Sequence, residues 1–279
     1  MHDAAKLSDS AGGSEPQPAI TGSALAMLPR RDAILILVSI ALITALAWLY
    51  LVHLNRQMGP TMAQDQMMAA MGMPIDRLWT LADLFFSFVM WAVMMVGMMG
   101  PSAAPMVLVF AAAQSERGSE RVSLSAGSFG LGYVFVWIVF SAGAAIAQLA
   151  LHKMALLSPA MAVLSPRIGG ATLIVAGLYQ MTPWKGACLT HCRSPLSFLM
   201  THWRDGRWGA FEIGAHHGAY CLGCCWALMM ILFVVGVMNL VWVAALAALV
   251  LLEKVGPYGT ALARISGAVL AVYGIVLFA

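Results

Sequence analysis

All five cysteines of this 279-residue chain lie between Cys188 and Cys225. Two of them are four residues apart, and another two are three apart, so each pair resembles half of a four-ligand site. Thiolates and imidazoles together bind Zn(II), Cu(I) or iron–sulfur clusters. We therefore take these side chains as candidate metal ligands: Cys188, His191, Cys192, His217, Cys221 and Cys224.

Helical periodicity predicts where the later cysteines point. At about 100° per residue, His217, Cys221, Cys224 and Cys225 fall within one sector of about 100°. A polar stripe in lipid is costly unless it faces protein or water, so we expect it to face the interior of a helical bundle. The 188–192 segment is then well placed to meet it. The alternative is a helix-packing face of small residues, and Cys225, at the edge of the sector, fits that alternative best.

Methionine supplies a second kind of soft donor. Met90, Met94 and Met98 share one face of an apolar helix, and thioether sulfur selects Cu(I) over hard cations. We expect these three side chains to line a path for the metal, although methionine at this spacing is also common core filling. Pro101 and Pro105 interrupt the same helix and free backbone carbonyls, a feature of transporter binding sites.

A further group of methionines lies earlier in the chain. The segment 58–73 contains six, and we interpret it as an outer loop that captures a soft ion outside the membrane. The alternative is a flexible amphipathic turn in which methionine is only an apolar filler.

The elements that must position these groups are transmembrane helices. The chain is 61% hydrophobic and 10% charged, whereas soluble domains average about a quarter charged residues. A spanning helix needs roughly 20 apolar residues, and no strand-like alternation is present. We predict an all-α polytopic bundle of about seven spans, the second interrupted by glycine and proline: 33–54, 82–113, 126–151, 165–182, 212–237, 239–254 and 260–279.

Charge distribution predicts the topology of this bundle. With a cytoplasmic N-terminus, eleven of the fifteen Lys and Arg residues fall on the cytoplasmic side, as the positive-inside rule requires. We predict a multi-pass protein of a bacterial inner membrane, with three parts. Residues 1–30 form a disordered cytoplasmic tail, 31–80 an anchor helix with the methionine-rich outer loop, and 81–279 a metal-binding multi-helix membrane domain.

Four segments carry a resemblance to a known family: "WAVMMVGMMGPSAAPM", "CLTHCRSPLSFL", "GAHHGAYCLGCCWALMMILFVVGVMNLVW" and "LEK". Over roughly residues 80–279 the chain resembles a bacterial family of predicted metal-binding integral membrane proteins, domain of unknown function 2182. The resemblance implies a multi-helix membrane protein with a metal site. The identity of the metal follows from the ligand chemistry alone.

The donor set favours Cu(I), with zinc as the alternative. We interpret the protein as one that binds Cu(I) and transports or transfers it across the membrane, without catalytic activity. One rival is a non-transporting metallochaperone, assembly factor or sensor, and another is a thiol oxidoreductase that uses the paired cysteines. The expected partners are the lipid bilayer, the metal ion and a metallochaperone or oxidase-assembly protein, with no nucleic acid.

Overall fold

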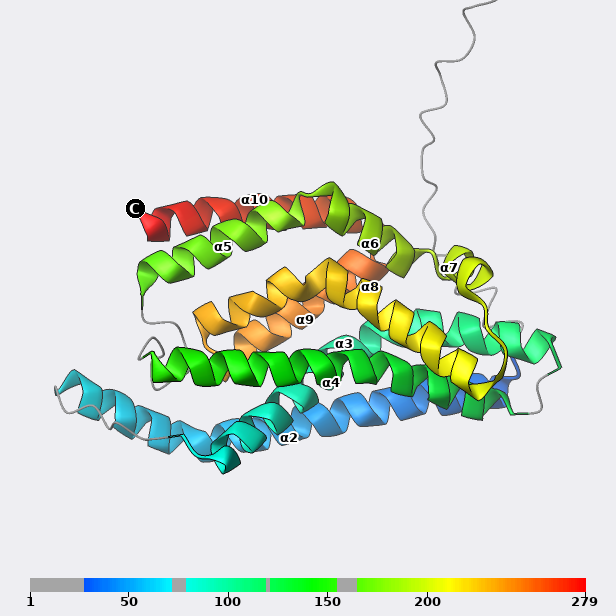
Figure 1. The fold of residues 1–279 in the computed structure, drawn as a ribbon, viewed down its shortest axis with the longest axis horizontal. Helices are drawn as coiled ribbons and strands as arrows, with labels where there is room; N and C mark the ends of the chain where they lie inside the picture. The colour runs from blue at the N-terminus through cyan, green and yellow to red at the C-terminus, as the bar shows by residue number, and fades with distance from the viewer. Residues whose placement is uncertain (1–27, 72–78, 119–120, 155–164) are drawn as a thin grey trace, which may run out of the picture.

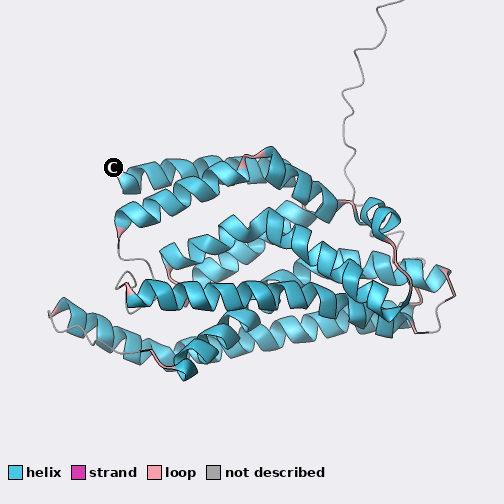
Figure 2. Ribbon diagram, viewed as in Figure 1, coloured by secondary structure: helices cyan, strands magenta, loops and turns pink. Residues whose placement is uncertain are grey.

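The computed structural model describes residues 28–71, 79–118, 121–154 and 165–279. The regular elements of this part of the chain are all helices (Figure 2). The predicted tail over 1–30 falls almost wholly outside the described residues. The helices are α2 (Arg30–Ala70), α3 (Leu81–Glu116), α4 (Val122–Lys153), α5 (Pro166–Gln180), α6 (Pro183–Arg193), α7 (Pro195–His202), α8 (Gly206–Val235), α9 (Leu240–Val255) and α10 (Gly259–Phe278).

The predicted all-α class is confirmed, and five helices are long and apolar enough to cross a membrane: α2, α3, α4, α8 and α10. The remaining two predicted spans are α5 and α9, which have 15 and 16 residues. These lengths and compositions are compatible with a multi-pass membrane protein. The short helices α6 and α7 lie between the fourth and fifth predicted spans.

The long helices alternate in direction along the bundle (Figure 1). The N-terminal ends of α2 and α8 lie at the end of the bundle that carries α7, whereas the C-terminus lies at the opposite end. This arrangement agrees with an odd number of passes. The candidate ligands of α6 therefore approach α8 from the end that the charge distribution assigns to the cytoplasm.

The prediction of a methionine-rich loop is wrong for the residues up to Ala70, because this segment continues α2 as a helix. Met, Ala and Gln are strong helix formers, and the single Pro60 removes only one hydrogen-bond donor. The helix has 41 residues, which is about 60 Å at 1.5 Å per residue, roughly twice the hydrocarbon thickness of a bilayer. Its C-terminal end extends beyond the other helices (Figure 1). Met73 lies outside the described residues.

Helix α3 begins at a capping box. The Thr80 backbone N–H donates to Asp83 Oδ2 at 2.8 Å, and the Asp83 N–H donates to the Thr80 hydroxyl at 3.3 Å. The helix then continues through Pro101 and Pro105 without ending. The expected interruption is therefore a local loss of backbone hydrogen bonds inside one helix, because proline cannot donate to the carbonyl four residues earlier.

Helices α4 and α8 touch backbone to backbone at two glycines. A Cβ at Gly132 would overlap the carbonyl of Phe211, and a Cβ at Gly214 would overlap the carbonyl of Phe129. Because glycine has no side chain, the two helices can approach this closely, as is common for helices packed in membranes. These contacts set the register of α8, and hence the depth of its cysteines in the bundle.

Candidate metal centre

The first half of the candidate site lies on α6. This helix begins at the Thr182 N-cap, whose hydroxyl accepts from the Lys185 N–H at 3.3 Å, with Pro183 in the first turn where its missing N–H costs nothing. Cys188 and Cys192 lie one turn apart, and both thiols are half-buried. A single helical turn therefore presents both sulfurs toward α8.

The structure places these thiols against the cysteines of α8. A Cβ added at Gly223 would lie 3.0 Å from Cys188 Sγ. The Cys192 thiol is hydrogen-bonded to that of Cys224, and this bond together with burial raises the pKa of Cys192 well above its ordinary value. Burial, and then the neighbouring Cys224, also raise the pKa of Cys188. Both α6 thiols thus favour the protonated form until a metal displaces the proton.

Cys221 lies deeper and is fully buried. Its sulfur is 3.0 Å from the Tyr133 hydroxyl and accepts from Lys254 Nζ at 2.7 Å. The thiols of Cys224 and Cys225 both donate to the Cys221 carbonyl, at 3.1 and 2.9 Å. Three cysteines of α8 therefore gather around one turn of the helix, with a hydroxyl and an ammonium beside the innermost sulfur.

The two candidate histidines contact aromatic rings. His191 stacks on Tyr220 with ring centroids 4.5 Å apart, and its Nδ1 is 2.8 Å from the Ala187 carbonyl. His217 is buried, with its ring 5.7 Å from that of Tyr133 and 5.8 Å from that of Phe198. Buried nitrogens normally have a partner, but His217 Nδ1 has none in the described structure. It is the one candidate imidazole with an unused buried donor atom.

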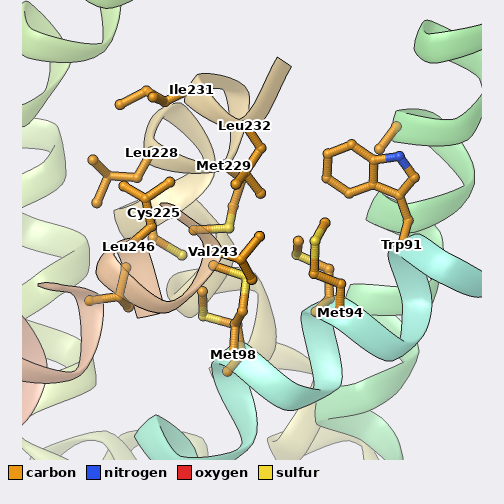
Figure 3. Packing of buried hydrophobic residues seen from close by; sticks show 14 of the residues in the cluster. Trp91, Met94, Met98, Cys225, Leu228, Met229, Ile231, Leu232, Val243 and Leu246 are labelled. Carbon is orange, nitrogen blue, oxygen red and sulfur yellow. The ribbon is translucent and has the colours of Figure 1, made fainter. Parts of the chain in front are cut away.

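The methionines of α3 share an apolar cluster with these thiols. Met90, Met94 and Met98 are all buried in the cluster that also contains the α8 cysteines. Figure 3 shows Met94 and Met98 directed toward Met229 and Cys225. Thioether and thiol sulfurs thus lie in one continuous buried region, beside Trp91 and Val243.

Two lysine contacts were missed by the sequence analysis. Lys185 and Glu253 are both buried and form an ion pair at 2.6 Å, with Gln180 donating to the same carboxylate at 3.0 Å. Lys254 reaches Cys221 and also donates to the Ser102 hydroxyl at 3.2 Å. The available signal was the "LEK" motif at the end of an otherwise apolar helix, because ionisable residues inside membrane segments are costly and usually functional.

The donor chemistry of these side chains suits a soft metal ion. Among the described residues, no three His, Cys, Asp or Glu side chains form a group that could hold a metal ion as they stand. A structural zinc site needs four such ligands in tetrahedral geometry. Thiolates and thioethers are soft donors, and α3, α6 and α8 bring side chains of both kinds together.

The fold and the donors define a class: all-helical proteins with several helices long and apolar enough to cross a membrane, and with buried thiols suited to a soft metal. The profile of a copper chaperone family, PpoB2, matches residues 88–277. This match covers more than half of the chain, so the protein belongs to the PpoB2 copper chaperone family. The matched region includes α3 from Phe88 onward and every candidate ligand, but not α2. No curated protein and no solved structure matches the chain.

Proposed function

We propose that this protein is a membrane-embedded copper chaperone that binds Cu(I) between α6 and α8 and hands it to an acceptor protein. We place it in the inner membrane of a bacterium and assign it no catalytic activity. The observation that supports the proposal is the meeting of Cys188 and Cys192 with Cys224 across two helices. Soft sulfur donors gathered in this way suit Cu(I).

The exposure of the thiols supports a hand-over by ligand exchange. Cys188 and Cys192 are half-buried, whereas Cys221 and Cys224 are buried. An acceptor thiol would therefore reach Cys188 first, while the deeper sulfurs still hold the ion. Cu(I) then moves from one thiolate pair to the next without being released into water.

Anaerobic purification followed by metal analysis tests this function. We expect copper bound in a stoichiometric amount, and we expect its loss when Cys188, Cys192, Cys221 and Cys224 are replaced by Ser. Cys225→Ser is the matched control, because it makes the same chemical change one residue along α8, and we expect it to retain copper. Stoichiometric zinc, or metal-free protein whose cysteine pairs are oxidised to disulfides by a quinone, would contradict the proposal; the second result would favour a thiol oxidoreductase.

A second candidate function is passage of Cu(I) across the membrane. The supporting observation is that Met90, Met94 and Met98 belong to the same buried cluster as the α8 thiols. Thiolates bind Cu(I) more tightly than thioethers, so affinity would increase from the methionines toward the cysteines. Measuring Cu(I) uptake into proteoliposomes distinguishes passage across the membrane from binding alone.

A further inference from the structure

Lys254 is buried near the C-terminal end of α9 and belongs to the thiol cluster rather than to an ion pair. Its Nζ donates to Cys221 Sγ at 2.7 Å and to Ser102 Oγ at 3.2 Å. No carboxylate partner of Lys254 occurs among the described residues. The adjacent Glu253 instead pairs with Lys185, on the other side of α9.

Two lysines at this end of the bundle therefore have different electrostatic roles. The charge of Lys185 is balanced by Glu253 at 2.6 Å, so that pair adds no net charge. Lys254 adds one positive charge directly beside the Cys221 sulfur, where its partners are a thiol and a hydroxyl. In a buried site, charges interact strongly because water screens them little.

This positive charge discriminates between metal ions by their valence. A monovalent ion held by two thiolates is a complex with one excess negative charge, which the ammonium of Lys254 neutralises. A divalent ion held by the same two thiolates is already neutral, so Lys254 leaves the site with an excess positive charge. Uncompensated charge is costly in a low-dielectric interior, and the monovalent complex is favoured.

The geometry points to Lys254 as the residue that makes the thiol centre selective for monovalent thiophilic ions such as Cu(I) and Ag(I) over divalent ions such as Zn(II) and Cd(II). This inference rests on the proposed function, because it takes the α8 thiols as ligands. Lys254 acts here through its charge and its contact with Cys221, and it is not itself a metal ligand.

The test measures two affinities on each purified variant. Cu(I) affinity is determined by competition with a chromophoric Cu(I) chelator, and Zn(II) affinity by competition with a chromophoric zinc chelator. For Lys254→Met we expect the ratio of Cu(I) to Zn(II) affinity to fall at least tenfold, with Cu(I) weakened and Zn(II) unchanged or strengthened. Lys254→Arg keeps the charge and should keep the ratio of the unmodified protein.

A second variant covers the case in which Lys254→Met does not fold. Ser102→Asp leaves the lysine in place and sets a carboxylate next to its ammonium, so it cancels the charge in another way. We expect the same fall in the ratio, together with a folded protein, since the new carboxylate has a partner.

The outcomes separate this inference from the proposed function. A ratio that stays within twofold in the folded variants overturns the role of Lys254 while the unmodified protein still binds Cu(I). If the affinities for both ions fall equally, Lys254 makes only a structural contact, and its role in selectivity is also overturned. If the unmodified protein binds no Cu(I), the proposed function itself fails.

Discussion

The sulfur of Cys188 on α6 lies directly over Gly223 on α8, where a Cβ would come within 3.0 Å of it. The glycine gives the thiol room to approach Cys224, and it lies between the cysteines of α8 on the side that α6 covers. Any side chain at position 223 must push the Cys188 sulfur outward by a few tenths of an ångström.

Replacement of Gly223 by Ala should therefore weaken Cu(I) binding while leaving the helix intact. We expect an affinity loss of roughly tenfold, about 1.4 kcal/mol. The free energy of unfolding should not fall, because Ala replaces Gly inside a helix with a gain of about 0.5–1 kcal/mol. Competition with a Cu(I) chelator and thermal unfolding in detergent measure the two effects.

Gly186→Ala is the matched control for this change. Gly186 lies on α6, and a Cβ there would meet nothing within 4 Å. We expect the same helix stabilisation without any loss of Cu(I) affinity. Equal affinities of the two variants would show that the Cys188 sulfur is not held at the metal centre by its contact with Gly223.

Removing one partner of the buried ion pair between Lys185 and Glu253 should destabilise the fold, whereas removing both partners together should cost much less. Lys185→Met leaves an unpaired carboxylate in the interior and should lower the free energy of unfolding by about 3–5 kcal/mol. The double replacement with Glu253→Met should recover most of that loss, because both buried charges are removed. Unfolding temperatures of the single and double variants would contradict this prediction if they were equal.

Cu(I) affinity should increase with pH. The pKa values of Cys188 and Cys192 are raised by burial and by the neighbouring Cys224, so both thiols carry protons at neutral pH. Each thiol that becomes a ligand must release its proton, and affinity should therefore rise about tenfold per pH unit for each such thiol, until pH exceeds its pKa. Chelator competition from about pH 6 to about pH 8 measures the slope.

The control for the pH dependence is a variant that lacks both cysteines of α6. The double replacement of Cys188 and Cys192 by Ser should flatten the slope as well as lower the affinity, whereas Cys225→Ser should leave the slope unchanged. A slope that survives in the double variant would assign the released protons to other groups.

Passage of Cu(I) through the membrane should depend on the methionines of α3. Met94→Leu conserves volume in the core, at a cost usually below about 1.5 kcal/mol, but removes the sulfur. We expect Cu(I) uptake into proteoliposomes to fall several-fold while equilibrium binding at the thiols stays unchanged. Met106→Leu is the control, since Met106 is buried on the same helix in the second apolar cluster. Equal uptake by both variants would favour a chaperone without a transmembrane path.

Much of the architecture follows from periodicity and hydropathy. The apolar segments around 82–113, 126–151 and 212–237 become α3, α4 and α8 with boundaries shifted by a few residues. The cysteine stripe of α8 points inward because a bundle interior is where small polar groups find partners. Its adjacency to α6 was expected from the same argument. Whether these thiols are ligands remains a prediction.

The contacts that the sequence did not reveal are long-range ones. The partners Tyr133 and Cys221 are 88 residues apart, and Lys185 and Glu253 are 68 apart. Pairing at such separation depends on how helices pack, which a single sequence does not encode as a local pattern. The stacking of His191 on Tyr220 is another such contact, and its role as a ligand stays a prediction.

The backbone contacts at Gly132 and Gly214 also constrain how the protein can move. Where the carbonyl of one helix contacts the glycine of another, the two helices cannot slide past each other without a steric clash. We therefore expect α4 and α8 to move together. No such glycine contact with α4 restrains α6, which is short and bounded by prolines on both sides. The Lys185–Glu253 ion pair holds α6 to α9 instead, so the metal would leave by exchange of the α6 thiols while the deeper sulfurs of α8 stay in place.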